Sequence, residues 1–480
     1  MNLGLIKTFD FSGRAIEIPD LFEDEPHVFF LDSALPNKTT GRFSFIGFDP
    51  FEIFQGRGKD CWRLLEKKFS EYSEYFKEVS NQLSTPFGAG IVGYLSYDSG
   101  FYLENISGHS KNDLALPDCF FGFYDCVITI DHLLKKLIVV SCGLPEKNSR
   151  RRQKRAQDRL KKILQRLSSS QGRKTRSEFT DFSKNNVVVS RKGLGNPAKI
   201  HKDLKSNFTK QEYLRAVQRI LEYIKCGDVY QVNLSQRFEY NLTKTRYSPF
   251  EIYQRLRNVS SFNFGGYLDC GDFQIISSSP ERFIKLENNL VSTSPMKGTR
   301  ARGENFREDQ NKCHELLKSR KDRAELLMIT DLERNDLGRV CEYGSVRVKN
   351  MRSLEKYRTV FQTTSTINGI LRKDKDAFDL LQACFPGGSV TGCPKIRAME
   401  IIEALEPNHR GVYTGALGYL SFSGRQMDFN ILIRTLVAMH DKIYFHAGGG
   451  IVADSIPEEE YEETLVKARA MRVCLETYEG

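Results

Sequence analysis

The sequence predicts an α+β fold with largely antiparallel sheets. Short apolar or alternating runs of strand length, bounded by Gly, Pro, Asp or Asn, recur along the chain, and amphipathic segments of helix length lie among them. The two kinds of segment do not alternate regularly, which disfavours a doubly wound parallel sheet. The 480 residues suffice for a large core, and 40% hydrophobic with 28% charged residues is typical of a globular enzyme.

Residues 1–145 are predicted to form a β-rich subdomain. Strands are expected over Val28–Leu31, Phe43–Gly47, Phe51–Phe54, Gly90–Leu95, Cys126–Ile130 and Leu137–Ser141. One helix is expected over Cys61–Val79, because apolar residues recur at helical intervals at Leu64, Leu65, Phe69, Tyr72 and Phe76.

Residues 146–205 are predicted to form a basic helix followed by a polar connector. The formal charge of the chain is +10, whereas residues 150–176 alone carry twelve Lys and Arg and one acid, so the rest of the chain is close to neutral. Charge confined to one segment disfavours a nucleic-acid enzyme. A solvated helix is favoured over an anionic or membrane partner, because the apolar face is narrow and has no aromatic anchor. That face consists of Ala156, Leu160, Ile163, Leu164 and Leu167.

Residues 206–480 have the densest pattern and are predicted to form the largest domain. Thr209 and Glu212 have the spacing of a capping box at the start of a helix over Lys210–Cys226. Further helices are expected over Pro249–Asn258, Asn305–Asp331, Asp376–Cys384, Lys395–Leu405 and Pro457–Leu475. Strands are expected over Val229–Phe238, Phe273–Ser277, Arg282–Leu286, Tyr357–Ile370, Ala416–Phe422, Phe429–Ala438 and Lys442–Ala447.

The cysteines and the N-terminus predict a cytoplasmic protein. The eleven cysteines are scattered without a CxxC pair, so neither a disulfide framework nor a zinc site is expected. No apolar run reaches the roughly 18 residues of a membrane span, and Met1–Asp10 lacks the features of a signal peptide.

Lys297 is the first candidate for chemistry. It lies between Pro295 and Gly298, directly after the strand-like run Leu290–Thr293, so a tight turn would point its amine at a defined position. A free lysine has a pKa of roughly 10.4, and burial must lower this value before the amine becomes a good nucleophile. Taken alone, the pattern is more typical of a lysine in a surface turn.

Two predicted helices each carry a pair of carboxylates three residues apart. Asp322 and Glu325 form one pair, and Glu460 and Glu463 form the other. Such faces could hold Mg²⁺, which takes oxygen ligands and retains several waters. Acid-rich helix faces are more often simply solvated.

Glycine-rich segments provide further candidates. Gly387–Lys395 precedes a predicted helix and could direct amide donors at a carboxylate, although it does not match the nucleotide P-loop GxxxxGK[ST]. The amides of His446–Ile451 could cradle an anion. Asp331–Arg339 could be a plain helix C-terminus.

Together these motifs resemble those of the chorismate-utilising enzymes. The resemblance covers most of the chain and rests on Ser279–Arg282, Pro295–Thr299, Asp322–Glu325, Asp331–Val340, Gly387–Lys395, Arg410–Tyr413, Ile433–Thr435, Ala447–Val452, Glu460–Glu463, Leu31–Ser33, Arg42–Gly47 and Val92–Tyr94. It implies the fold of anthranilate synthase component I, in which antiparallel sheets pack as a sandwich with helices outside. It also implies that residues 206–480 are the chorismate-binding catalytic domain.

Lys297 discriminates within this family, because aminodeoxychorismate synthases characteristically have lysine in the PxKGT motif where anthranilate synthases have alanine. By resemblance, Lys297 attacks C2 of chorismate while Glu281 acts as general acid or base at the departing C4 hydroxyl. Ammonia then adds at C4 and expels the lysine, giving 4-amino-4-deoxychorismate for p-aminobenzoate and folate biosynthesis. Anthranilate synthase is the alternative, and a non-catalytic chorismate-binding subunit is another.

The resemblance also implies which residues bind the metal ion, the substrate and tryptophan. Mg²⁺ would be held by Glu325 and Glu463, with Asp322 and Glu460 helping through water. The enolpyruvyl carboxylate would be held by Tyr413, Arg434, Gly449 and Gly450. The site would also be lined by Thr299, Gln362, Ser389 and Lys395. A tryptophan-binding element of the family resembles Leu31-Asp32-Ser33, with Asp in place of Glu, which implies a site formed by Asp32, Ser33, Arg42 and Ser44.

Gln362, where anthranilate synthases have a histidine, is a departure compatible with the aminodeoxychorismate branch. Met296 and Cys393 replace the usual isoleucine and a common alanine. The sequence contains no Gly-x-Cys-x-Gly glutaminase elbow. The resemblance therefore implies that a separate glutamine amidotransferase subunit supplies ammonia.

Overall fold

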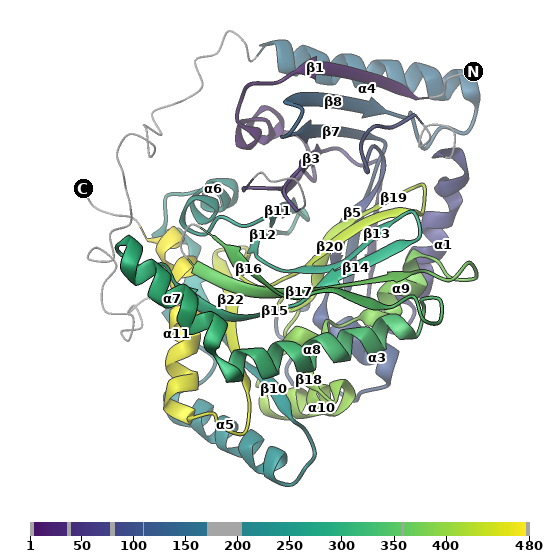
Figure 1. The fold of residues 1–480 in the computed structure, drawn as a ribbon. Helices are drawn as coiled ribbons and strands as arrows, with labels where there is room; N and C mark the ends of the chain where they lie inside the picture. The colour runs from purple at the N-terminus through teal and green to yellow at the C-terminus, as the bar shows by residue number, and fades with distance from the viewer. Residues whose placement is uncertain are drawn as a thin grey trace.

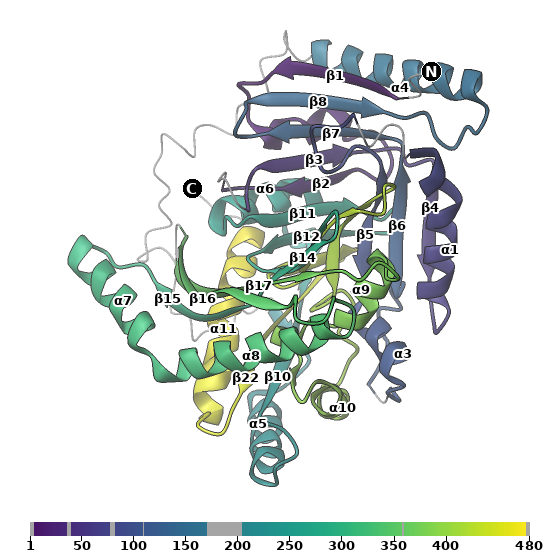
Figure 2. The same ribbon diagram turned by 45° about the vertical axis from the view of Figure 1, so that its right-hand side comes forward.

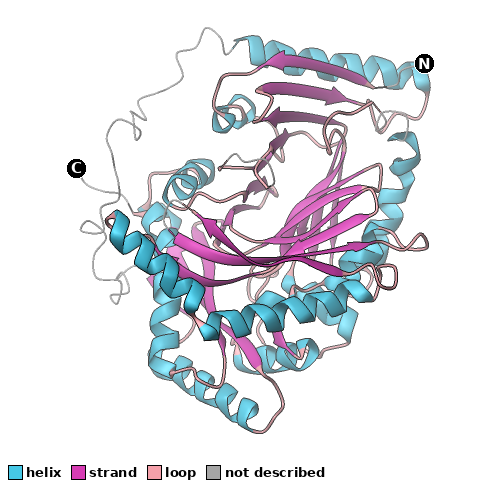
Figure 3. Ribbon diagram, in the orientation of Figure 1, coloured by secondary structure: helices cyan, strands magenta, loops and turns pink. Residues whose placement is uncertain are grey.

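Two large antiparallel sheets pack face to face at the centre of the molecule, and helices cover their outer faces (Figures 1 and 3). The computed structural model describes residues 4–35, 40–76, 82–108, 110–169, 204–357 and 360–476. This arrangement confirms the predicted α+β sandwich with helices outside.

The first sheet contains strands from both ends of the chain, as Figure 2 shows. Its order is β1 (Leu5–Asp10), β8 (Lys136–Ser141), β7 (Cys126–Asp131), β3 (Phe43–Gly47), β2 (Phe29–Asp32), β11 (Phe264–Asp269), β12 (Phe273–Ser279), β21 (Thr435–Met439), β22 (Lys442–Ile451), β10 (Gln231–Asn241) and β18 (Gly392–Cys393), with β9 (Leu204–Ser206) also beside β10.

The second sheet likewise combines early and late strands. Its order is β15 (Met296–Ala301), β17 (Val360–Ile370), β14 (Leu290–Ser294), β13 (Arg282–Glu287), β20 (Gln426–Ile431), β19 (Ala416–Ser421), β5 (Gly90–Leu95), β6 (Cys119–Tyr124) and β4 (Glu52–Gly56), with β16 (Arg347–Lys356) also beside β17. Residues 1–145 and 206–480 therefore share both sheets, through the pairs β2–β11 and β5–β19.

Aromatic side chains fill the space between the sheets. Phe29 and Phe45 of the first sheet meet Tyr94 and Tyr419 of the second within one buried cluster. The helices pack outside this layer: α1 (Cys61–Ser73), α3 (Phe101–Glu104), α4 (Ser149–Ser169), α5 (Lys210–Lys225), α6 (Pro249–Val259), α7 (Phe306–Lys318), α8 (Arg320–Gly338), α9 (Ala377–Cys384), α10 (Lys395–Leu405) and α11 (Pro457–Leu475). Burial of apolar side chains on both faces of each sheet is the main force that holds the two sheets and the helices outside them together.

Several elements depart from the sequence prediction. The long helix expected over Asn305–Asp331 is two helices, because Ser319 has an extended backbone and its hydroxyl accepts the Asp322 amide at 3.1 Å, which begins α8. The strand expected over Phe429–Ala438 is divided into β20 and β21 around Arg434, whose φ is 53°. The strands β1, β6, β9, β11, β15, β16 and β18 are not among those predicted from the sequence. The capping box of α5 is confirmed.

The basic helix α4 is less solvated than the sequence suggested. The helix lies beside β1 and β8 (Figure 1), and Leu160 and Ile163 of its predicted apolar face are buried in the core. Arg159, only 9% exposed, pairs with Asp49 and Asp125, and Arg166 pairs with Asp24 and Glu25. Much of the positive charge is thus neutralised within the molecule. Of the predicted connector, only the residues in β9 belong to the described part of the chain.

Among the described residues, none of the helices combines the length and the apolar character that crossing a bilayer requires.

Candidate active site

Lys297 lies on a strand rather than in the predicted turn. β15 pairs with β17, and the register shifts between Lys297 and Thr299 at Gly298, whose φ is 74°. This is a bulge, which glycine accommodates because it tolerates positive φ. A Cβ at Gly298 would lie 2.9 Å from Leu316 and 3.0 Å from Asp322, so glycine also lets the strand approach α7 and α8. The bulge, and not a turn, sets the direction of the Lys297 side chain.

The Lys297 amine is half-buried among charged groups of three other elements. Its Nζ donates to the carbonyl oxygen of Ser389 at 3.3 Å. Burial lowers the pKa of Lys297, and the positive charge of Lys467 lowers it further, while Glu325, Glu281 and Glu463 oppose this effect. The predicted nucleophile, acid and metal-binding glutamates are therefore close enough to influence one another's charge.

Glu281 is a buried carboxyl, 4% exposed, at the entry to β13. Burial raises the pKa of Glu281 to about 7, against the lowering influence of Ser389, Lys297 and the Met296 amide. Its Oε1 and the hydroxyl of Ser389 have no hydrogen-bond partner within the described residues. Unpaired buried polar atoms are uncommon in proteins and mark places where a ligand can bind. A carboxyl with this pKa can give or take a proton near neutral pH.

The predicted carboxylate pairs of α8 and α11 face the same region. Glu325 is half-buried, and burial raises its pKa. Glu463 forms an ion pair of 2.6 Å with Lys467, whose charge lowers the pKa of Glu463. A Cβ at Gly449 would lie 3.2 Å from Glu460 Oε2 and 3.3 Å from Glu463 Oε1, so glycine on β22 leaves room for both carboxylates.

The other two carboxylates, Asp322 and Glu460, already accept hydrogen bonds from side chains of the protein. Asp322 accepts from Arg300 at 3.0 Å, and Glu460 accepts from the Ser455 hydroxyl at 2.6 Å. Within the described part of the chain, no group of three or more His, Cys, Asp or Glu is arranged to hold a metal ion. The oxygen donors of Glu325 and Glu463 suit Mg²⁺, which commonly takes one or two carboxylates and completes its shell with water. Magnesium therefore stays a prediction.

The residues expected to bind the enolpyruvyl carboxylate include an unpaired cation. Arg434, in the left-handed conformation that separates β20 from β21, has no ion-pair partner among the described residues, and burial lowers its pKa. Tyr413 stacks on His446 with ring centroids 4.8 Å apart. Gly449 and Gly450 lie on β22 opposite Leu234 and Asn233 of β10. A half-buried, unpaired guanidinium is suited to a carboxylate ligand.

The remaining predicted lining residues occupy two kinds of position. Gln362 lies opposite Thr299 across β15 and β17 and donates to its hydroxyl at 3.2 Å. Lys395 is buried and donates to Asp336 at 2.6 Å and to the Cys384 carbonyl at 3.0 Å. The Lys395 amine thus joins the start of α10 to α8 and to the end of α9, and it is already bound within the protein.

Gln231 and Lys467 were not singled out from the sequence. Gln231 is fully buried, and neither polar atom of its amide has a partner among the described residues. A Cβ at Gly450 would lie 2.9 Å from Gln231 Nε2. Gln231 falls among the polar residues of an alternating strand, QVNLSQRFEYN, so the sequence alone contains no signal that it is buried. Lys467 follows Glu463 by one helical turn, and that spacing could have indicated the pair.

A separate cavity of about 560 Å³ lies between the two sheets and contains most of the predicted tryptophan-like element. Asp32, Ser33 and Arg42 line it, and Ser44 lies behind them with hydrogen bonds to Asp32 and to the Ser33 amide. Asp32 is 3% exposed and accepts from Arg257 and from the Tyr253 hydroxyl. Arg42 pairs with Asp131 at 2.8 Å. The charge of the Asp32 carboxylate is therefore already balanced within the protein by Arg257.

The sandwich and its acidic, lysine-containing site define an enzyme class that comparison with known proteins identifies. The family described as chorismate binding enzyme matches residues 27–473, and the chain belongs to that family. The chain is 36% identical to "Anthranilate synthase component 1" of Acetivibrio thermocellus, over 95% of this chain and 91% of that protein. It is also 36% identical to "Aminodeoxychorismate synthase component 1" of Bacillus subtilis, over 96% of this chain and 94% of that protein.

A solved structure supports the same assignment. Anthranilate synthase component I from Streptococcus pneumoniae matches with a TM-score of 0.74 and 31% identity, over 91% of this chain and 93% of that one. The protein is thus a chorismate-utilising enzyme of the anthranilate and aminodeoxychorismate synthase type.

Proposed function

We propose that the protein is the chorismate-converting component of an aminodeoxychorismate synthase. The observation that carries this proposal is Lys297: a half-buried amine with a lowered pKa lies among Glu281, Glu325 and Glu463. A bystander lysine would normally extend into solvent, whereas this amine is enclosed beside a carboxyl suited to proton transfer.

In the proposed reaction, the neutral Lys297 amine forms a bond to C2 of chorismate. The ring double bonds shift, and the C4 hydroxyl leaves as water after taking a proton from Glu281. Ammonia then bonds to C4 and loses a proton, which returns to Glu281. The C2–nitrogen bond breaks, and the neutral amine of Lys297 is restored. Covalent addition divides one difficult substitution into two easier steps.

Other residues would hold the substrate. Arg434, Tyr413 and the amides of Gly449 and Gly450 are proposed to bind the enolpyruvyl carboxylate. We also propose that Glu325 and Glu463 hold Mg²⁺, with Asp322 and Glu460 helping through water. When bound, the ion would supply Lewis-acid stabilisation at the ring carboxylate.

Ammonia is proposed to come from a separate glutamine amidotransferase subunit. The related proteins are themselves named as a first component, and this sequence has no glutaminase elbow. Free ammonium salt should replace that subunit in vitro.

Product analysis tests the proposal against anthranilate synthase. Purified protein is incubated with chorismate, Mg²⁺ and ammonium chloride, with and without an added aminodeoxychorismate lyase. The proposal expects p-aminobenzoate only when the lyase is present. Fluorescent anthranilate without lyase would refute it, and no turnover of chorismate would favour a non-catalytic chorismate-binding subunit.

We further propose that the cavity between the sheets binds a free amino acid such as tryptophan, because the Asp32–Ser33 element and Arg42 line it. Calorimetric titration with tryptophan tests this proposal, with saturable heat expected. Absence of any heat or thermal shift at millimolar tryptophan would refute it.

A further inference from the structure

Arg410 is a buried arginine whose planar donors connect two sides of the active site. It is 3% exposed and lies just after α10. One terminal nitrogen donates to the carbonyl of Val390 at 3.0 Å, and the other donates to the carbonyl of Asn233 at 2.5 Å. Buried main-chain carbonyls need such donors, and guanidinium can serve several at once.

The two carbonyls belong to segments that face the reacting groups. Val390 follows Ser389, whose carbonyl accepts from the Lys297 amine and which lies close enough to Glu281 to lower the pKa of that carboxyl. Asn233 lies opposite Gly450 across β10 and β22, at the glycines proposed to hold a carboxylate. Arg410 therefore lies between the segment that supports the amine and the segment that supports the carboxylate cradle.

Glu406 fixes the orientation of this guanidinium. Its carboxylate takes two hydrogen bonds from Arg410, at 2.9 and 2.7 Å, and accepts from the amide and hydroxyl of Ser235 at 2.8 and 3.0 Å. The ring of Tyr97 lies 4.7 Å from the guanidinium carbon. A bidentate pair enclosed in this way has little freedom to rotate.

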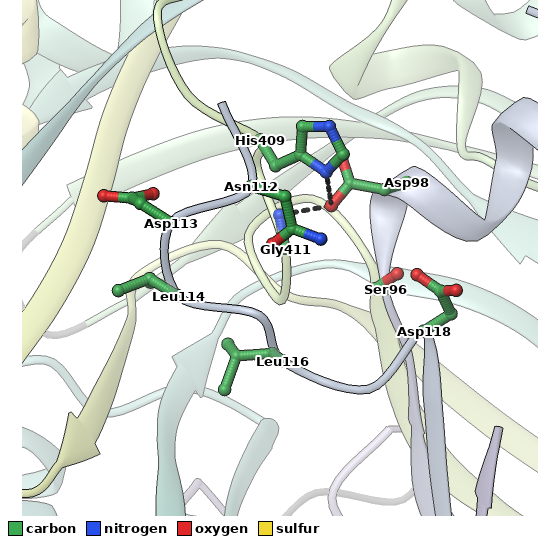
Figure 4. Close-up of a pocket in the computed structure, with 9 residues that line it drawn as sticks. All are labelled: Ser96, Asp98, Asn112, Asp113, Leu114, Leu116, Asp118, His409 and Gly411. Carbon is green, nitrogen blue, oxygen red and sulfur yellow. Dashed lines mark hydrogen bonds and ion pairs between the residues drawn. The ribbon is translucent and has the colours of Figure 1, made fainter. Parts of the chain in front are cut away.

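The chain on either side of Arg410 is held from the outside. Figure 4 shows His409 and Gly411 directed at Asp98. The Gly411 amide donates to Asp98 Oδ2 at 2.8 Å, and His409 Nδ1 lies 3.7 Å from the same oxygen. Those residues border a small cavity of about 10 Å³. The backbone of Arg410 is fixed independently of its side chain.

We propose that Arg410 is a positioning residue that sets the placement of the Lys297 and Glu281 side of the site relative to the Gly449–Gly450 cradle. This inference rests on the proposed function for the roles of those groups. The residue does not touch the reacting atoms. It acts by holding the Val390 carbonyl and the Asn233 carbonyl of β10 at a fixed separation. A displacement of about 1 Å at a reacting pair can cost roughly 100-fold in rate.

The Arg410→Lys variant tests the proposal. Lysine keeps the charge but cannot make two parallel bonds to Glu406 while also reaching both carbonyls. The matched control is Arg237→Lys on β10, because Arg237 is also buried and bidentate, with bonds of 2.9 and 2.6 Å to Asp113. Among the described residues, the Arg237 side chain hydrogen-bonds to Asp113 and not to the Gly388–Val390 segment.

Both variants are compared with wild type by thermal unfolding, kcat and KM for chorismate, with ammonium chloride as nitrogen source. We expect Arg410→Lys to lower kcat about 10- to 100-fold with KM changed less than about threefold. Arg237→Lys should have a comparable loss of Tm and a kcat within twofold of wild type. Equal kcat losses in the two variants, or an unchanged kcat in Arg410→Lys, would overturn the proposal.

If Arg410→Lys folds poorly, two further measurements still test the proposal. Glu406→Gln keeps the side-chain shape but weakens the hold on the guanidinium, so it should lower kcat in the same direction. Arg410→Ala should regain part of its kcat when guanidinium chloride is added at a non-denaturing concentration. If Glu406→Gln leaves kcat unchanged and guanidinium does not restore it in Arg410→Ala, the positioning role of Arg410 is refuted. If the wild-type product proved to be anthranilate, the proposed function would fail, yet these kcat comparisons would still decide the role of Arg410.

Discussion

The amine of Lys297 lies 3.3 Å from the main-chain carbonyl oxygen of Ser389. A neutral amine that donates one N–H to this acceptor keeps its lone pair free for a carbon centre. The hydroxyl of the same Ser389 and Oε1 of Glu281 have no partner among the described residues. The loop that orients the amine therefore also borders the group proposed to release a proton.

Replacing Lys297 by alanine should abolish the covalent route. Aminodeoxychorismate formation should slow by at least roughly 100-fold, the scale of a lost catalytic group. Intact-mass spectrometry of protein mixed with chorismate in the absence of ammonia should detect an adduct on the wild type and none on Lys297→Ala. The control is Lys318→Ala, an exposed lysine at the end of α7. Unchanged turnover in Lys297→Ala would remove the lysine from the mechanism.

Glu281 should give activity an alkaline limit near neutral pH. The protonated form is the proposed donor, and its pKa is raised by burial to about 7. Turnover limited by departure of the hydroxyl should fall tenfold for each pH unit above that value. Glu281→Gln should be slow at every pH and lack this midpoint. A wild-type profile flat from pH 6 to 9 would contradict the role of Glu281 as acid.

The same group should also affect stability. Its pKa is 4.5 in the unfolded chain and about 7 in the folded one. Between these values the folded state binds more protons, so the free energy of unfolding should fall as pH rises and level off above pH 7. The loss should be about 3 kcal/mol relative to Glu281→Gln. Denaturant titrations of both proteins from pH 4.5 to 8 measure it, and parallel curves would argue against the raised pKa.

Local signals account for the elements that were predicted well. Pro457 at the first position of α11 and the Thr209–Glu212 box of α5 mark helix starts through contacts within one turn. The same kind of signal was overlooked at Ser319, whose cap divides the predicted long helix. β15 was missed because its bulge at Gly298 resembles a turn when the partner strand β17, more than sixty residues later, is unknown.

The residues of the site likewise differ in whether a local sequence pattern could predict them. The motifs identified Lys297 and Glu281 because each belongs to a short continuous pattern. The pairing of Lys395 with Asp336, or of Asp32 with Arg257, joins residues distant in sequence, and no local pattern indicates either partner. The residues of the site could therefore be predicted from the sequence. Which of them line the site and which of them support it depends on tertiary contacts.

Glu463→Gln should weaken the dependence of activity on Mg²⁺. The substitution removes a negative oxygen ligand but retains the side-chain shape, so the Mg²⁺ concentration for half-maximal activity should rise about tenfold. The control on the same helix is Glu462→Gln, whose carboxylate pairs with Lys210 at 3.4 Å on the outer surface. Calorimetric titration with Mg²⁺ alone gives a readout separate from turnover. Equal Mg²⁺ dependence in wild type and Glu463→Gln would remove this residue from the metal site.

Asp32→Asn should destabilise the fold, although Asp32 lies in the cavity proposed for a ligand. The carboxylate is buried and accepts from Arg257 and from Tyr253 at 3.0 Å, so its loss leaves a largely enclosed guanidinium without a counter-charge. Breaking one partner of a buried pair costs about 3 kcal/mol. Asp60→Asn, which removes an exposed pair with Arg63, should cost less than about 1 kcal/mol. Denaturant unfolding measures both, and a double variant Asp32→Asn/Arg257→Met should recover part of the loss because it removes the unpaired charge. Equal stabilities for Asp32→Asn and wild type would show that the pair contributes little, leaving ligand binding as the better explanation for an aspartate at this position.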